Sequence, residues 1–417
     1  MTDMTQETLR FEYDGRHVPF AKIVAVNAIY QLLTGMIFRF WARTRERKYL
    51  WSHVRLGDDR LEYTGTGLEL FLGFLIVLAV ILFPVIGGFT LAMILFGDDP
   101  VVFGVVYALY ILVLVFLMYV AVYRARRYRL TRTVWRGIRG TLTGSSVKYA
   151  LAAMGYTLLV MATLGLASPV MRIGLVRREI ENMHLGNRPF TFHGKVGDLF
   201  RLWILPWLSL PLLLGILFIS GAYDSPAFKP MATEVVEPPE MNGGVAAATL
   251  FAYLLTILAM SWYRVAEFRY LAGNVGFEGM RFSSTLGFGR VFWIHFSSYL
   301  LIFGFFILFF MALMGAVVGL VGWDMLVAAA SNEIDPETIA AGMDEQRFGA
   351  VIMLFVFIFA VGSHVLNRVL VFHRMAHAVV TSLALTGTQD FSQVAQALDE
   401  APKVGEGLAD AFDLGDF

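Results

Sequence analysis

Hydrophobic and polar positions along the chain follow two patterns. Short alternations, of the form apolar-x-apolar-x-Gly or a small residue, occur six times. They predict short β-strands, because successive side chains of a strand point to opposite faces. They occupy residues 11–15, 61–65, 140–144, 190–194, 280–284 and 383–387. Long apolar runs lie between most of them and predict helices. The recurrence of one pattern along the chain indicates internal duplication.

Six apolar runs are long enough to cross a bilayer, whose hydrocarbon core of about 30 Å needs about 20 helical residues. They are residues 68–96, 101–123, 199–222, 245–263, 291–321 and 351–371. We expect three hairpins with acidic tips. Two shorter runs, residues 18–33 and 147–162, would rise only about 24 Å as helices. Because each meets a breaker, at Thr34-Gly35 or at Thr163-Leu164-Gly165, they predict re-entrant or kinked hairpins.

Composition supports a membrane location. The chain is 57% hydrophobic and 16% charged, with a mean hydropathy of +0.65, which is far more apolar surface than one soluble core could bury. It has no cysteine, so disulfides, thiolate metal sites and cysteine nucleophiles are excluded. The net charge is zero, yet arginines crowd residues 124–139. By the positive-inside bias this loop, and with it both termini, is expected in the cytoplasm.

These patterns define an expected architecture. The fold class is an all-α polytopic membrane protein with repeated transmembrane hairpins, short re-entrant or kinked helices and a small cytoplasmic layer of short β-strands. The expected parts are an N-terminus with the first strand, a first repeat made of a short and a full hairpin, a second repeat, a partial third repeat and an acidic tail. They cover residues 1–17, 18–139, 140–289, 290–388 and 389–417.

One part of the chain resembles a known family. It contains the motifs Phe40-Trp41-Ala42-Arg43, Tyr49-Leu50-Trp51-Ser52-His53 and Glu62-Tyr63-Thr64-Gly65-Thr66-Gly67. They are similar to the signature of the YjgN-like family of bacterial inner-membrane proteins, a domain of unknown function. The similarity is specific over residues 11–75 and returns more weakly at 172–203. It implies a multi-pass protein of the bacterial cytoplasmic (inner) membrane and implies no particular activity.

Basic and aromatic residues gather at the ends of several apolar runs. Guanidinium groups and aromatic rings in this arrangement suit the layer of lipid headgroups. The candidate interface residues are Trp41, Arg43, Arg45, Arg47, Tyr49, Trp51, Arg124, Arg126, Arg127, Tyr128, Arg264 and Arg269. They are interpreted as a topological anchor, with a specific site for anionic lipid or another ligand as the alternative. Nucleic acid fits poorly, because the charges lie beside membrane runs and sum to zero.

Polar residues beside the two breakers are candidates for a cavity in the membrane. An arginine at that depth must pair, touch water or extend to the surface. The candidate cavity residues are Thr34, Gly35, Arg39, Thr163, Gly165 and Arg172. Elsewhere, Glu267 is expected to pair with Arg264, three residues earlier. His373 and His377 share one face of a predicted helix, but two ligands do not make a metal site.

Two functions fit these patterns. The first is transport or conduction of a small solute or lipid through a polar cavity built by the repeats. The alternative is a non-catalytic module that binds anionic lipid or a partner protein through its basic, aromatic cytoplasmic face. Phosphate-binding loops and hydrolase motifs are absent, so we expect no enzyme, no cofactor and no metal. The expected partners are membrane lipids, and a homo-oligomer or another membrane protein stays open.

Overall fold

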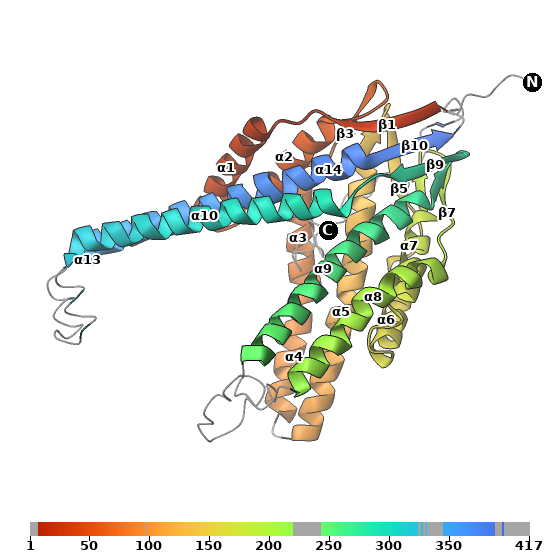
Figure 1. Cartoon of the computed structure of the whole chain (residues 1–417). Helices are drawn as coiled ribbons and strands as arrows, with labels where there is room; N and C mark the ends of the chain where they lie inside the picture. The colour runs from red at the N-terminus through yellow and green to blue at the C-terminus, as the bar shows by residue number, and fades with distance from the viewer. Residues whose placement is uncertain are drawn as a thin grey trace, which may run out of the picture. The chain divides into compact units, whose positions relative to one another are not determined.

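The computed structural model describes residues 7–97, 99–219, 243–323, 327, 331, 345–387 and 394–395. Ten strands form a closed barrel in which consecutive strands are neighbours and β10 returns to pair with β1. The strands are β1 (Glu7–Tyr13), β2 (Val54–Leu56), β3 (Asp59–Tyr63), β4 (Thr133–Trp135), β5 (Ile138–Leu142), β6 (Met183–Leu185), β7 (Arg188–Phe192), β8 (Val275–Phe277), β9 (Met280–Ser284) and β10 (Leu383–Gly387). Figure 1 shows β1 in red beside β10 in blue.

The expected fold class was wrong, because the strands close into a ten-stranded antiparallel barrel rather than a small layer. Each of the six alternations overlaps a strand, but β2, β4, β6 and β8 have only three residues each. Three residues are too few to show an alternating pattern. These short strands pair between the predicted ones. They remove the open edges that a small layer would have left.

Tight turns join each short strand to the long strand that follows it. Arg136 and Gly137, between β4 and β5, have φ angles of 53° and 74°. Glu278 and Gly279, between β8 and β9, have φ angles of 46° and 78°. Two consecutive residues with positive φ are typical of a type I′ turn, whose twist matches that of an antiparallel pair. The turns therefore set the register of these hairpins.

Helical insertions separate the strand hairpins. The chain leaves the barrel after each odd-numbered strand and returns before the next strand. The inserted helices are α1 (His17–Leu33), α2 (Arg39–Ser52), α3 (Gly67–Val77), the π-helix η1 (Leu78–Leu82), α4 (Phe83–Phe96), α5 (Pro100–Thr131), α6 (Ser146–Ala162), α7 (Ser168–Ile180), α8 (Val196–Ile219), α9 (Gly243–Gly273), α10 (Phe288–Val321), α13 (Glu345–Leu366), the π-helix η3 (Asn367–His373) and α14 (Arg374–Ser382). Because neighbouring strands are antiparallel, every departure and return of the chain occurs at the same end of the barrel.

One backbone hydrogen bond recurs where each insertion begins and ends. The residue after an odd-numbered strand donates its N–H to the carbonyl of the residue before the next strand, at N–O distances of 2.9 to 3.1 Å. The donor and acceptor pairs are Asp14 and His53, Thr64 and Arg132, Thr143 and Asn182, His193 and Asn274, and Thr285 and Ser382. Each bond extends the ladder between two strands by one rung and fixes the ends of the insertion beside each other.

The two short apolar runs each form a helix, a left-handed turn and a second helix. The first helices, α1 and α6, have 17 residues each. The left-handed residues are Gly35, Met36, Leu164 and Gly165, with φ angles of 57°, 69°, 49° and 89°. The hydroxyls of Thr34 and Thr163 close the turns: each donates to a carbonyl of the preceding helix and accepts an N–H at the start of the next.

Among the described residues, five helices are long and apolar enough to cross a membrane. They are Pro100–Thr131, Val196–Ile216, Ala247–Gly273, Phe288–Val321 and Gln346–Ser382. Each overlaps one expected span. The remaining expected span, residues 68–96, is divided into α3, η1 and α4. Most of the acidic tips and of the tail, residues 389–417, lie outside the described residues.

Contacts divide the chain into two compact units. The first unit contains residues 54–288, together with residues 1–12 and 381–417 at the chain ends, and so holds nearly the whole barrel and helices α3 to α9. Its barrel core includes Phe277, Met280 and Leu385. The second unit contains residues 13–53 and 289–380, with α1, α2, α13, η3 and nearly all of α10 and α14. The expected repeat boundaries stay a prediction.

Candidate functional site

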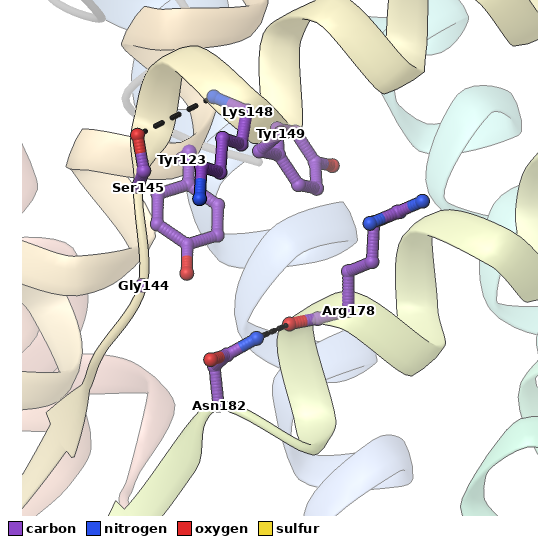
Figure 2. A pocket seen from close by; sticks show the side chains of 7 residues that line it. All are labelled: Tyr123, Gly144, Ser145, Lys148, Tyr149, Arg178 and Asn182. Atoms are coloured by element: carbon purple, nitrogen blue, oxygen red, sulfur yellow. Dashed lines mark hydrogen bonds between the residues drawn. The ribbon is translucent and has the colours of Figure 1, made fainter.

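A pocket of about 290 Å³ lies in the first unit, where the chain passes from β5 into α6. Figure 2 shows its lining, which comes from α5, from the start of α6 and from the end of α7. The lining residues are Tyr123, Gly144, Ser145, Lys148, Tyr149, Arg178 and Asn182. We call this the α6–α7 pocket.

The start of α6 is shaped by local hydrogen bonds. Gly144 has a φ of 88°, and a Cβ there would lie 3.0 Å from the hydroxyl of Tyr123. Ser145 caps the helix by accepting the N–H of Lys148. The Tyr123 hydroxyl and the Arg127 guanidinium donate to the carbonyls of Thr143 and Gly144, respectively. Residues 143–145 are thus held against α5, and the pocket has a fixed rim.

The pocket presents positive charge. Lys148 and Arg178 are exposed, and within the described part of the chain neither forms an ion pair. The nearby carboxylate of Glu179 is already bound by Arg126 and by the Tyr149 hydroxyl. Burial, and then the charge of Glu179, raise the pKa of Tyr149, which therefore stays a donor. Two exposed cations in one pocket are suited to binding a phosphate or carboxylate.

A second basic pocket, of about 660 Å³, lies within the second unit between α1 and α2. Its lining is part basic and part apolar, and consists of Lys22, Ile23, Val26, Asn27, Arg45, Lys48, Tyr49 and Ser52. Asn27 is fully buried; its amide donates to the carbonyl of Ala42, and its oxygen accepts from Arg45. We call this the α1–α2 pocket.

One residue distinguishes the two helix hairpins. In the first, the Tyr49 hydroxyl accepts the N–H of Arg16 at 2.9 Å and donates to its carbonyl at 2.8 Å. Tyr270 of α9 makes the same pair of bonds with Lys195. Arg178 follows Thr163 at the distance along the chain at which Tyr49 follows Thr34. Arg178, which lines the α6–α7 pocket, therefore occupies the position that Tyr49 has in the first hairpin, where the tyrosine hydroxyl hydrogen-bonds to the backbone.

The candidate interface residues fall into two groups. Arg45 and Tyr49 line the α1–α2 pocket, and Arg124, Arg264 and Arg269 are exposed. Trp41, Arg43 and Trp51 are half-buried on α2. The others use their polar groups inside the protein. Arg126 pairs with Glu179, Arg127 binds a carbonyl, and Arg47 and Tyr128 are buried.

The candidate cavity residues lie at the two left-handed turns or in the helices that follow. Arg39 begins α2, and its guanidinium lies 5.0 Å from the ring of Phe40. The Gly165 carbonyl accepts the indole N–H of Trp203 at 3.0 Å. Leu33 and Leu164 beside the turns are 71% and 84% exposed. The turns thus combine satisfied polar groups with exposed apolar side chains.

Arg172 pairs with Glu267 of α9. The expected partner of Glu267, Arg264, is exposed instead. Glu267 is buried, and its pairing with Arg172 joins α7 to α9. The sequence could not indicate this contact, because the two residues are 95 positions apart.

Lys22, Lys148 and Arg178 were missed by the sequence analysis. Lys22 and Lys148 were single cations outside the dense arginine clusters, and Arg178 stands beside only one other arginine, Arg177. For Lys148 a signal existed, because it is the third residue after the capping Ser145. Within the part of the chain that the structure describes, no group of three histidine or acidic side chains could hold a metal ion.

The model of one protein family, described as a bacterial protein of unknown function (DUF898), matches residues 8–411. The chain belongs to this family. The DUF898 match runs from β1 past β10, so it spans the barrel and all its insertions. The resemblance predicted from residues 11–75 is thereby confirmed. No curated protein and no solved structure matches the chain.

Proposed function

We propose that this DUF898 protein is a multi-pass protein of the bacterial cytoplasmic membrane, with both termini in the cytoplasm, that binds anionic lipid headgroups and catalyses no reaction. The observation that carries the proposal is the α6–α7 pocket, in which Lys148 and Arg178 face an open space without ion-pair partners among the described residues. The α1–α2 pocket, with three cations beside Ile23 and Val26, supports the same chemistry.

Anionic lipid fits these pockets for two reasons. Lysine and arginine form charge-assisted hydrogen bonds with phosphate oxygens. Both pockets are also built from helices of the hairpins that carry exposed apolar turns, and such turns are suited to contact with acyl chains. The cytoplasmic orientation rests on the arginines of residues 124–139. The backbone hydrogen bond that recurs at the ends of each insertion supports internal duplication as the origin of the barrel.

Transport is less well supported than lipid binding. A transport site would need the polar groups of the two turns to face water or substrate. The Thr34 and Thr163 hydroxyls instead close their own turns, and Arg172 is paired with Glu267. The side-chain polar groups of Thr34, Thr163 and Arg172 are therefore already used inside the protein.

The double variant K148Q/R178Q is expected to weaken binding of phosphatidylglycerol by about tenfold or more, since a hydrogen bond to a charged group contributes about 1.5–3 kcal/mol. Binding is measured by native mass spectrometry of the full chain in detergent, titrated with dioctanoyl phosphatidylglycerol, with the phosphatidylcholine analogue in a parallel titration. Inorganic phosphate is added as a competitor, to separate a lipid site from a site for free phosphate.

The matched control is K195Q/R201Q, which removes the same charge from exposed positions of the same unit outside the pocket. It should bind phosphatidylglycerol like the wild type. Equal losses in the two double variants, or no preference of the wild type for the anionic lipid, would refute the proposal. Displacement of the lipid by millimolar phosphate would indicate a site for the free anion.

A further inference from the structure

Two histidines meet at the start of α1 in the second unit. His373, the last residue of η3, is fully buried. Its Nδ1 lies 3.0 Å from the Nδ1 of His17, the first residue of α1. A contact between two imidazole nitrogens holds one proton, so one ring donates and the other accepts. The contact joins residues 356 positions apart and requires that at least one ring be neutral.

Aromatic rings enclose the buried member of this pair. Phe20 stacks on His373 with a centroid distance of 4.8 Å, and Tyr13 meets it edge-on at 5.5 Å. The Nε2 of His373 and the hydroxyl of Tyr13 are both buried, and neither has a hydrogen-bond partner among the described residues. A positive charge on His373 would therefore be poorly solvated, whereas His17 is exposed to solvent.

The groups around the pair include one carboxylate, that of Asp14, beside neutral and basic groups. The titratable and charged groups around the pair are Tyr13 and Asp14 after β1, Arg16 before α1, Tyr49 and His53 of α2, Arg290 of α10 and His377 of α14. Burial raises the pKa of Tyr13 and of Tyr49, so both phenols stay neutral. A guanidinium nitrogen of Arg290 lies 3.3 Å from the Nδ1 of His377 and adds positive charge.

We propose that His17 and His373 form a pH-sensitive latch, which holds α1 against η3 while His373 is neutral and releases α1 when both rings are protonated. In the closed latch the Nδ1–H of one ring donates to the Nδ1 of the other ring. As the pH falls, protonation of both rings removes the accepting nitrogen and places two positive charges next to each other. The contact then becomes repulsive, and the open form binds protons more strongly than the closed form.

The π-helical form of η3 supports a dedicated role for this contact. A π-helical segment inside a helix is uncommon and occurs often at functional sites. In η3 it ends at His373, and the same segment carries Arg368, which pairs with Glu46 of α2. Release of α1 would also act on Tyr49, whose hydroxyl binds the backbone of Arg16. The latch does not involve the α6–α7 pocket, on which the proposed lipid binding rests.

Hydrogen exchange of the full chain in detergent tests the latch. Amide exchange in α1 is measured at about pH 8 and about pH 5, on either side of the ordinary histidine pKa of about 6.5, and corrected for the intrinsic effect of pH. We expect α1 to exchange about tenfold faster at the lower pH, the change that corresponds to one pKa unit. Helix α6 is the internal control, because it has the same length and the same type of turn but contains no histidine.

Two variants locate the effect. H17Q keeps a side chain that can donate or accept a hydrogen bond but cannot titrate, so α1 should lose its response to pH. H53Q removes a neighbouring histidine whose ring binds the Tyr49 carbonyl instead of the pair, so its response should persist. Equal exchange of α1 at both pH values in the wild type, an equal rise in α6, or an unchanged response in H17Q would overturn the proposal. If H17Q does not fold, the wild-type comparison of α1 with α6 decides.

Discussion

Replacement of Glu46 by alanine is expected to destabilise the protein by about 3–5 kcal/mol, the usual cost of removing one partner from a buried ion pair. The Glu46 carboxylate accepts two hydrogen bonds from the Arg368 guanidinium, at 3.0 and 2.7 Å. The two side chains are only 4% and 15% exposed. In E46A the guanidinium would stay among helices without its carboxylate. Thermal unfolding of the purified full chain measures the loss.

An exposed ion pair in the same chain provides the control. Asp59 pairs with Arg136 at 2.5 Å, and their side chains are 41% and 44% exposed. D59A should therefore cost at most about 1 kcal/mol. The double variant E46L/R368L removes both buried charges and should regain most of the stability lost in E46A. If D59A and E46A lower the unfolding temperature equally, the loss of the buried Glu46–Arg368 pair does not explain the instability of E46A. The same holds if E46L/R368L is no more stable than E46A.

The barrel shows which strands a sequence pattern can predict and which it cannot. Its longer strands have five or seven residues, and their alternation was visible. The three-residue strands were not visible, although they provide four of the ten positions around the barrel. A closed barrel could not be inferred without them, because six strands separated by helices do not specify their neighbours. A further local signal for these hairpins was present in the two-residue turns Arg136-Gly137 and Glu278-Gly279. The sequence analysis did not use it.

The candidate site shows a different limit. Residue type indicated which side chains suit a headgroup layer, and Arg45 and Tyr49 do line a basic pocket. The same criterion also selected Arg47 and Tyr128, which are buried. Whether an arginine at a helix end faces lipid or a carboxylate depends on contacts made over long distances. Glu46 and Arg368 are 322 positions apart, and no local pattern carries that information.

Replacement of Gly186 by alanine is expected to lower the free energy of unfolding clearly more than the same change at Gly57. Both glycines begin turns between strands, with positive φ angles of 58° and 64°. An alanine at either position is therefore destabilised by about 1–2 kcal/mol in its left-handed conformation. Their surroundings differ. A Cβ at Gly57 would meet the Leu9 side chain at 3.5 Å, an ordinary contact. A Cβ at Gly186 would lie 2.0 Å from the carbonyl oxygen of Ala395 and 2.9 Å from the Cγ2 of Ile138.

That close approach holds residues 394–395 against the barrel. Asn187 donates its N–H to the Ala395 carbonyl at 3.0 Å and accepts the Ala395 N–H at 3.1 Å. Val394 is buried in the cluster that contains Met280 and Leu385. G186A must displace this segment. The further loss is about 4 kcal/mol, from two hydrogen bonds at about 1 kcal/mol each and the burial of one valine at about 2 kcal/mol.

A shortened chain separates the two causes. In a chain that ends at Gly387, residues 394–395 are absent, so the Ala395 contact at Gly186 no longer exists. The Ile138 Cγ2, 2.9 Å from the added Cβ, remains, but it is the end of a side chain that can shift. The loss in the free energy of unfolding for G186A should then fall to nearly that for G57A, as measured by denaturation of each variant against its own parent chain. If G186A stays the more damaging change by the same margin in the shortened chain, the cause lies in the turn and its contact with Ile138. Only a difference that disappears with the tail shows that residues 394–395 stabilise the closed barrel.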